Sequence, residues 1–130
     1  MSTIAIPPTI PSDANHSSVH LNKANVTKGT VTQLTDVTTT VVVNAAAGVI
    51  TMFTSTLAAD ATEAFTVTNS SCSATSVVLA NGLGLTGAGG ATAVITVNVE
   101  DVAEGSFVIR IGNGSAVALN GILTVGFLIV

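Results

Sequence analysis

The stretch Gly29–Asn44, GTVTQLTDVTTTVVVN, decides the fold class of this chain. Threonine and valine crowd it, and β-branched side chains of this kind are stiff at χ1 and fit a pleated, half-buried surface. In an extended strand, Val41 and Val43 share one face and Val42 takes the other. The stretch therefore predicts β-structure, and the rest of the chain is interpreted around it.

Beyond Asn44, short apolar runs alternate with turn-forming Gly, Asn, Asp and Ser residues, a pattern typical of strands. We expect eight strands, at Gly29–Gln33, Thr39–Asn44, Val49–Thr54, Glu63–Thr68, Ala74–Leu79, Ala93–Val99, Ser106–Ile111 and Gly121–Val130. No helical period separates them, which favours antiparallel pairing because parallel strands need long crossovers. The expected fold class is all-β: an eight-stranded antiparallel β-sandwich, jelly-roll-like, with an immunoglobulin-like sandwich as the alternative.

Alternation along these strands selects the core, because residues two apart share a face. Trp and Tyr are absent, so aliphatic side chains and phenylalanine must fill it. The expected core residues are Val41, Val43, Phe65, Val67, Ile95, Val97, Phe107, Ile109, Leu123, Val125 and Phe127. Two segments are expected to lie outside the strands: a loop at Ala80–Ala91, where glycine is dense, and an acidic turn at Glu100–Gly105.

Residues 1–28 are expected to form an extended N-terminal arm, ahead of a sandwich domain at 29–130. Prolines in the arm fix φ and remove amide donors, which discourages regular structure. Isoleucines beside them are apolar enough to dock on a neighbouring subunit, although a terminus with no docking partner is the alternative. The residues expected to act in assembly are Ile4, Ile6, Pro7, Pro8, Ile10 and Pro11.

The composition indicates an assembly component. Charged residues make up 8 % of the chain, against about 25 % in typical soluble proteins, and the mean hydropathy is +0.72. A free monomer with so little charge would expose larger apolar patches than soluble proteins usually carry. We therefore expect a homo-oligomer, taken to be a trimer. The net charge of −4, with 3 basic residues in all, argues against nucleic-acid binding.

Membrane insertion is not expected. Ile111–Val130 is uncharged and about as long as a transmembrane helix. Glycine and asparagine interrupt it, however, and its apolar residues alternate as in strands. The N-terminus lacks the basic and apolar regions of a secretory signal peptide. With its single cysteine, Cys72, the chain cannot form an internal disulfide.

Two places carry residue types that could bind a metal ion, but no metal site and no cofactor is expected at either. His16 and His20 are four apart, as in helical zinc motifs, but no carboxylate or cysteine beside them completes the ligand set. Glu100, Asp101 and Glu104 carry oxygen ligands suited to calcium. A charged turn between two strands explains them as well, and their spacing matches no calcium loop.

Enzymatic activity is not expected either. Cys72 has no histidine near it in sequence, so a buried small side chain is its default interpretation. Both histidines lie in the arm, a poor platform for a preorganised triad. The glycine-rich segment leads into no helix with a Lys-Ser/Thr pair, as a phosphate-binding loop requires.

Three pieces of the chain carry a resemblance: GTVTQLTDVTTTVVVNAAAGVITM at Gly29–Met52, LAADATEAFTVTNS at Leu57–Ser70, and GSFVIRIGNGSAVALNGILTVGFLIV at Gly105–Val130. Together they resemble a recurrent type of virion protein from tailed phages and environmental viruses, in which GTVTQ opens a β-sandwich domain. The resemblance implies a sandwich on the virion surface, either a head decoration (cement) protein or a fibre module. The proline-rich arm and the ANGLGLTGAGG segment have no counterpart in it.

The function expected from these features is that of a head decoration protein on the capsid surface, bound to the major capsid protein or other virion proteins. One alternative is a receptor- or glycan-binding tip of a tail fibre, although the aromatic side chains that stack on sugars are scarce here. Another is an extracellular filament subunit whose arm completes a neighbour's sheet by strand addition.

Overall fold

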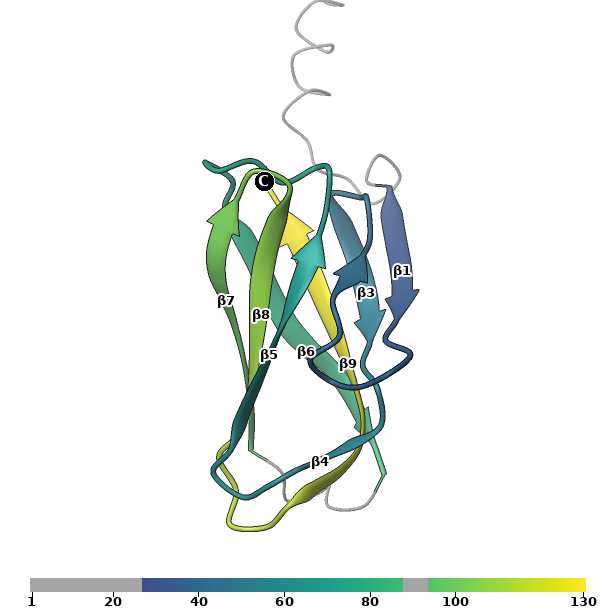
Figure 1. Cartoon of the computed structure of the whole chain (residues 1–130), viewed down its shortest axis with the longest axis vertical. Coiled ribbons are helices and arrows are strands. Elements are labelled where there is room, and N and C mark those ends of the chain that lie inside the picture. The colour runs from purple at the N-terminus through teal and green to yellow at the C-terminus, as the bar shows by residue number, and fades with distance from the viewer. Residues whose placement is uncertain (1–26, 88–93) are drawn as a thin grey trace, which may run out of the picture.

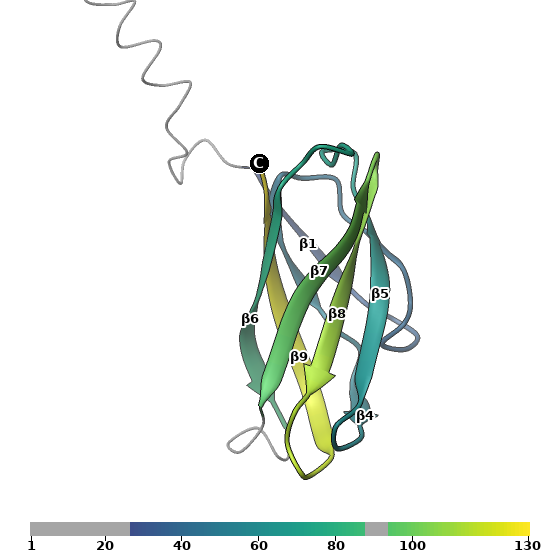
Figure 2. The ribbon, with the colours of Figure 1, turned by 90° about the vertical axis from the view of Figure 1, so that its left-hand side faces the viewer.

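The computed structural model describes residues 27–87 and 94–130. These residues contain no helix and form nine strands in two sheets packed face to face (Figures 1 and 2). The strands are β1 (Lys28–Thr32), β2 (Val41–Val42), β3 (Ala47–Thr51), β4 (Ser55–Leu57), β5 (Thr62–Thr68), β6 (Val78–Thr86), β7 (Ile95–Ala103), β8 (Ser106–Asn113) and β9 (Leu119–Ile129). The predicted all-β sandwich is confirmed.

Each sheet is built around one of the last two strands. In the β9 sheet, β6 pairs with one side of β9. β3 and β4 pair one after the other with different stretches of its other side, and β1 pairs with the free edge of β3. In the β8 sheet the order is β2-β5-β8-β7. In an immunoglobulin fold the last two strands share a sheet. Here they lie in different sheets, so the winding favours the jelly-roll-like description.

The prediction of purely antiparallel pairing is wrong at two places. β1 pairs parallel to β3, and β2 pairs parallel to β5. The chain leaves the β9 sheet after β1, forms β2 in the β8 sheet, and returns to form β3 (Figure 1). This excursion through the opposite sheet serves as the crossover that a parallel pair needs, so no helix is required.

The predicted count of eight strands and two of the predicted loops also need correction. β4 is an additional strand between the expected strands at Val49–Thr54 and Glu63–Thr68; it continues the line of β3 along β9 after a break at residues 52–54. β6 runs on to Thr86, well into the glycine-rich segment, because the ladder with β9 continues across an irregularity between Gly82 and Gly84. β7 likewise absorbs part of the expected acidic turn, which leaves Glu104 and Gly105 (φ 79°) as the hairpin turn.

The core lies between the sheets. Nine of the eleven residues assigned to it are buried: Val41, Val43, Phe65, Val67, Phe107, Ile109, Leu123, Val125 and Phe127. The Phe107 and Phe127 rings join the two sheets, with centroids 5.7 Å apart. Ile95 and Val97 are half-buried against this core. They border a hollow of about 360 Å3 where β6 and β7 face each other, and Gly82 and Gly84 leave it unfilled.

Three buried amide side chains hold the loops at the ends of the sandwich. Gln33 donates to the carbonyls of Val37 (3.2 Å) and Thr39 (2.9 Å), and its Oε1 accepts from the amide of Phe53. The last residue of the GTVTQ motif thus fixes the loop that crosses from the β9 sheet to the β8 sheet. A buried amide with all its partners in place specifies one loop conformation.

Asn69 and Asn113 do the same for two further loops. Asn69 Nδ2 donates to the carbonyl of Ala45, 2.7 Å away, and its Oδ1 accepts from the Ser71 amide. Asn113 Nδ2 donates to three carbonyls, those of Leu57, Ala58 and Val117, while its Oδ1 accepts from the amide and hydroxyl of Ser115. Both asparagines begin Asn-X-Ser sequons, but burial in these networks makes them structural residues.

Candidate assembly surface

The outward faces of the two sheets differ in charge. The outward face of the β8 sheet carries Glu100 and Arg110, with the exposed Asp101 at an irregularity of β7, whereas Glu63 shares the inward face of β5 with Phe65 and Val67. The five strands of the β9 sheet carry one charged residue, Lys28. A charge-poor sheet face is a candidate for contact with another protein surface.

Large apolar side chains gather at one end of the outward face of the β9 sheet. Leu79 and Leu83 on β6 are 58 % and 57 % exposed. Val77 and Val130 are exposed as well, and they lie just beyond the ends of β6 and β9 on the same face. Their backbones exchange two hydrogen bonds of 2.9 Å. These four residues are half of the large hydrophobic side chains that are exposed in the described part of the chain.

Between these rows lies a groove of about 430 Å3, which we call the outer trough. Leu79 and Leu83 of β6 form one wall and Ala47 and Val49 of β3 form the other, with Lys28 at the rim. Its floor follows β9 through Gly126 and Leu128. The absence of a side chain at Gly126 creates the depth, and Leu83 leans over this position.

The outer trough lies at the end of the sandwich where the arm joins. Lys28 begins β1 and pairs in register with Ala47, which in turn pairs with Leu128. The C-terminus is at the same end (Figures 1 and 2). The arm residues expected to act in assembly (Ile4, Ile6, Pro7, Pro8, Ile10 and Pro11) lie outside the described residues, as do His16 and His20.

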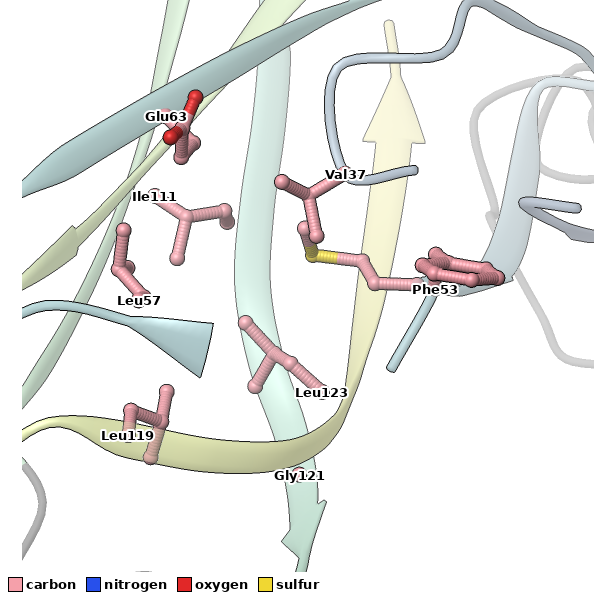
Figure 3. A pocket seen from close by; sticks show the side chains of 9 residues that line it. Val37, Phe53, Leu57, Glu63, Ile111, Leu119, Gly121 and Leu123 are labelled. Carbon is pink, nitrogen blue, oxygen red and sulfur yellow. The ribbon is translucent and has the colours of Figure 1, made fainter. Parts of the chain in front are cut away.

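An apolar pocket opens under the loop that Gln33 fixes. Figure 3 shows Val37, Phe53, Leu57, Ile111, Leu119 and Leu123 around it, with the carboxylate of Glu63 to one side. It encloses about 20 Å3, roughly the space of a single water and far below the 300 Å3 or more of typical ligand pockets. The pocket is a packing gap of the core.

The candidate calcium residues are not gathered into a site. Glu100 instead receives two hydrogen bonds from Arg110, at 2.7 and 3.1 Å, on the outward face of the β8 sheet. The Arg110 guanidinium lowers the pKa of the Glu100 carboxyl, while Glu100 raises the pKa of Arg110. Within residues 27–87 and 94–130, no three His, Cys, Asp or Glu side chains are grouped to hold a metal ion.

Cys72 is buried, and its Sγ lies 3.5 Å from the carbonyl oxygen of Ser106. The nearby turn is held by backbone bonds, from the Gly105 amide to the Cys72 carbonyl and from the Asn69 amide to the Gly105 carbonyl. The outer trough does not follow from the strand pattern of the sequence, because the dense glycines predict a loop at Leu83. The sequence feature that does indicate this surface is the lack of charged residues in both β6 and β9.

Comparisons with protein-family models, with curated proteins and with solved structures gave no match. Across the described ranges, no helix is long and apolar enough to cross a membrane.

Proposed function

We propose that this protein is a non-catalytic structural subunit of a virus particle, a decoration protein that coats and reinforces the capsid. The observation that carries the proposal is the outward face of the β9 sheet, with one charged residue on five strands and exposed leucines at one end. Removing such a face from water lowers the free energy by about 25 cal/mol per Å2 of apolar area.

The subunit's self-association is part of the proposal, with a trimer as the expected state. Contiguous exposed apolar patches mark interaction sites, and most soluble oligomers are homo-oligomers with closed symmetry. The polar outward face of the β8 sheet, with its Arg110–Glu100 pair, suits contact with water. In this proposal the β9 sheet faces the other proteins of the particle, sister subunits included, and the β8 sheet faces solvent.

The viral setting is supported by the resemblance of Gly29–Val130 to virion surface proteins. In particular, GTVTQ supplies Gln33, which fixes the first crossing loop, and the Asn-Ser pair supplies Asn69, which fixes another. The motifs of the resemblance are thus the ones that stabilise the sandwich. They support a shared architecture, and the charge-poor face supports an assembly role within it.

Immunogold labelling tests the proposal on intact particles. Antibodies raised against the purified protein should label the heads of virus particles from the source of this sequence. Label confined to the tail tips would favour the fibre alternative, and label on filaments free of particles would favour the filament alternative. Particles that carry no label would contradict a virion role.

A further inference from the structure

We infer that the outer trough receives residues 4–11, IAIPPTIP, from the arm of a neighbouring copy, so that subunits are joined by exchanged arms. This inference rests on the proposed assembly function and specifies how its contact is made.

The chemistry of the segment matches that of the trough. Residues 2–12 carry no charged side chain, and the lining of the trough is apolar apart from Asn81 and the Lys28 rim. Ile4, Ile6 and Ile10 supply branched apolar side chains next to the prolines. Exposed leucines on the wall and a glycine on the floor leave room for such branched side chains against the sheet.

The prolines favour docking on the face of the sheet over strand addition at its edge. A strand added to an edge must donate amide hydrogens to the ladder, and Pro7, Pro8 and Pro11 have none. The face of a sheet presents side chains and asks for no such donors. Proline-rich segments also bind apolar grooves at low entropic cost, because their extended conformation is preformed.

The arm leaves the sandwich beside the trough. Lys28, the first residue of β1, lines the rim, and 26 residues precede the described chain. Extended chain covers about 3.1 Å per residue, so residues 11–26 can span about 50 Å. That exceeds the length of β9, about 37 Å for its 11 residues. The segment can therefore reach the trough of an adjacent subunit.

A complementation experiment on the full-length chain tests the exchange. One variant carries Ile4→Asp and Ile6→Asp in the arm, and another carries Leu79→Glu and Leu83→Glu in the trough. Val42→Glu with Leu34→Glu is the matched control, since these side chains are exposed by 58 % and 81 % and lie away from the trough. Masses are measured by light scattering over a range of concentrations, and thermal melts check that each variant folds.

We expect wild type and control to assemble equally and each test variant alone to be monomeric. An equimolar mixture of the two test variants should regain 1:1 complexes, because the intact arm of one fits the intact trough of the other. If the arm variant assembles like wild type, the exchange is wrong while self-association stands. If the mixture stays monomeric, the arm occupies its own trough and the exchange between copies is wrong. If wild type is monomeric throughout, self-association fails as well.

Discussion

Leu83 of β6 lies directly over Gly126 of β9: a Cβ atom added at Gly126 would be 3.0 Å from Leu83 Cδ1. The contact is made on the outward face, where more than half of Leu83 is exposed. Gly126 therefore determines the shape of the outer trough, and its lack of a side chain is not required for packing between the sheets.

Gly126→Ala should separate assembly from stability. The alanine methyl displaces only the end of an exposed leucine, so the free energy of unfolding should change by about 0.5 kcal/mol or less. The floor of the outer trough rises and Leu83 shifts into it, so subunit association should weaken by about tenfold. Denaturant unfolding measures the first quantity and concentration-dependent light scattering the second. A large loss of stability with unchanged association would contradict this division.

Two glycines with opposite surroundings should respond oppositely to alanine. At Gly48 a Cβ would lie 2.7 Å from the carbonyl oxygen of Gly29 and 2.7 Å from the buried Phe127 ring, so Gly48→Ala should destabilise by about 1–3 kcal/mol. At Gly82 it would make ordinary contacts of 3.8 and 3.9 Å with Val97 and Leu123. Gly82→Ala should stabilise by about 0.5–1 kcal/mol, because it also lowers the entropy of the unfolded chain. Urea midpoints of the two variants and wild type test both signs.

Asn113→Ala should be costly. It removes the amide that donates to the carbonyls of Leu57, Ala58 and Val117 and accepts from the Ser115 amide. Ala58 and Val117 keep a second donor each, the Ala61 amide and the Ser115 hydroxyl, so the buried Leu57 carbonyl and the Ser115 amide lose most. Because an unsatisfied buried polar group costs about 1–3 kcal/mol, we expect a loss of about 2–4 kcal/mol, part of it recovered by water entering the site. Asn98→Ala, at an exposed position on β7, is the control and should change stability little. Equal midpoints for the two variants would rule out the structural role given to Asn113.

The Arg110–Glu100 pair should add a small stability that disappears in acid. Hydrogen bonds from Arg110 lower the pKa of Glu100 below the ordinary 4.5, so the folded state binds fewer protons there than the unfolded state. The contribution is therefore present above pH 4.5 and is lost as the pH falls through the lowered value. It is small because the two side chains are 39 % and 36 % exposed.

Thermal melts of wild type and Glu100→Gln between about pH 7 and pH 3 test this dependence. Wild type should melt slightly higher at neutral pH, and the two curves should converge in acid. The hydrogen bonds from Thr38 also lower the pKa of Asp36, so wild type as a whole should lose stability over the same range. A gap that widens in acid would contradict the assignment.

The all-β class and most of the core could be predicted because period-two alternation is local and strong. Phe107, Ile109, Val125 and Phe127 are buried as their alternation requires. Strand pairing could not be predicted, because whether β1 and β3 run parallel depends on the chain crossing to the other sheet between them. Local residue patterns do not determine which sheet a strand joins, so they do not predict this crossing.

The candidate surface was harder to predict than the core. Glycines at positions 82 and 84 suggested a loop, yet β6 continues through them because the ladder to β9 tolerates an irregularity. Leu83 thereby becomes a wall of the outer trough instead of a loop residue. Composition predicts that part of the surface is covered by other subunits, and the register of β6 on β9 is what makes the outer trough the candidate for that surface.

The most direct test of the central claim, that the outward face of the β9 sheet joins subunits, is the solution mass of the full-length Leu79→Glu, Leu83→Glu variant. Wild type and the Val42→Glu, Leu34→Glu control should form the same discrete oligomer, taken here to be a trimer. The trough variant should have the mass of a monomer while it melts cooperatively near the wild-type temperature. An oligomer of wild-type mass in the trough variant would contradict the claim and assign assembly to another face.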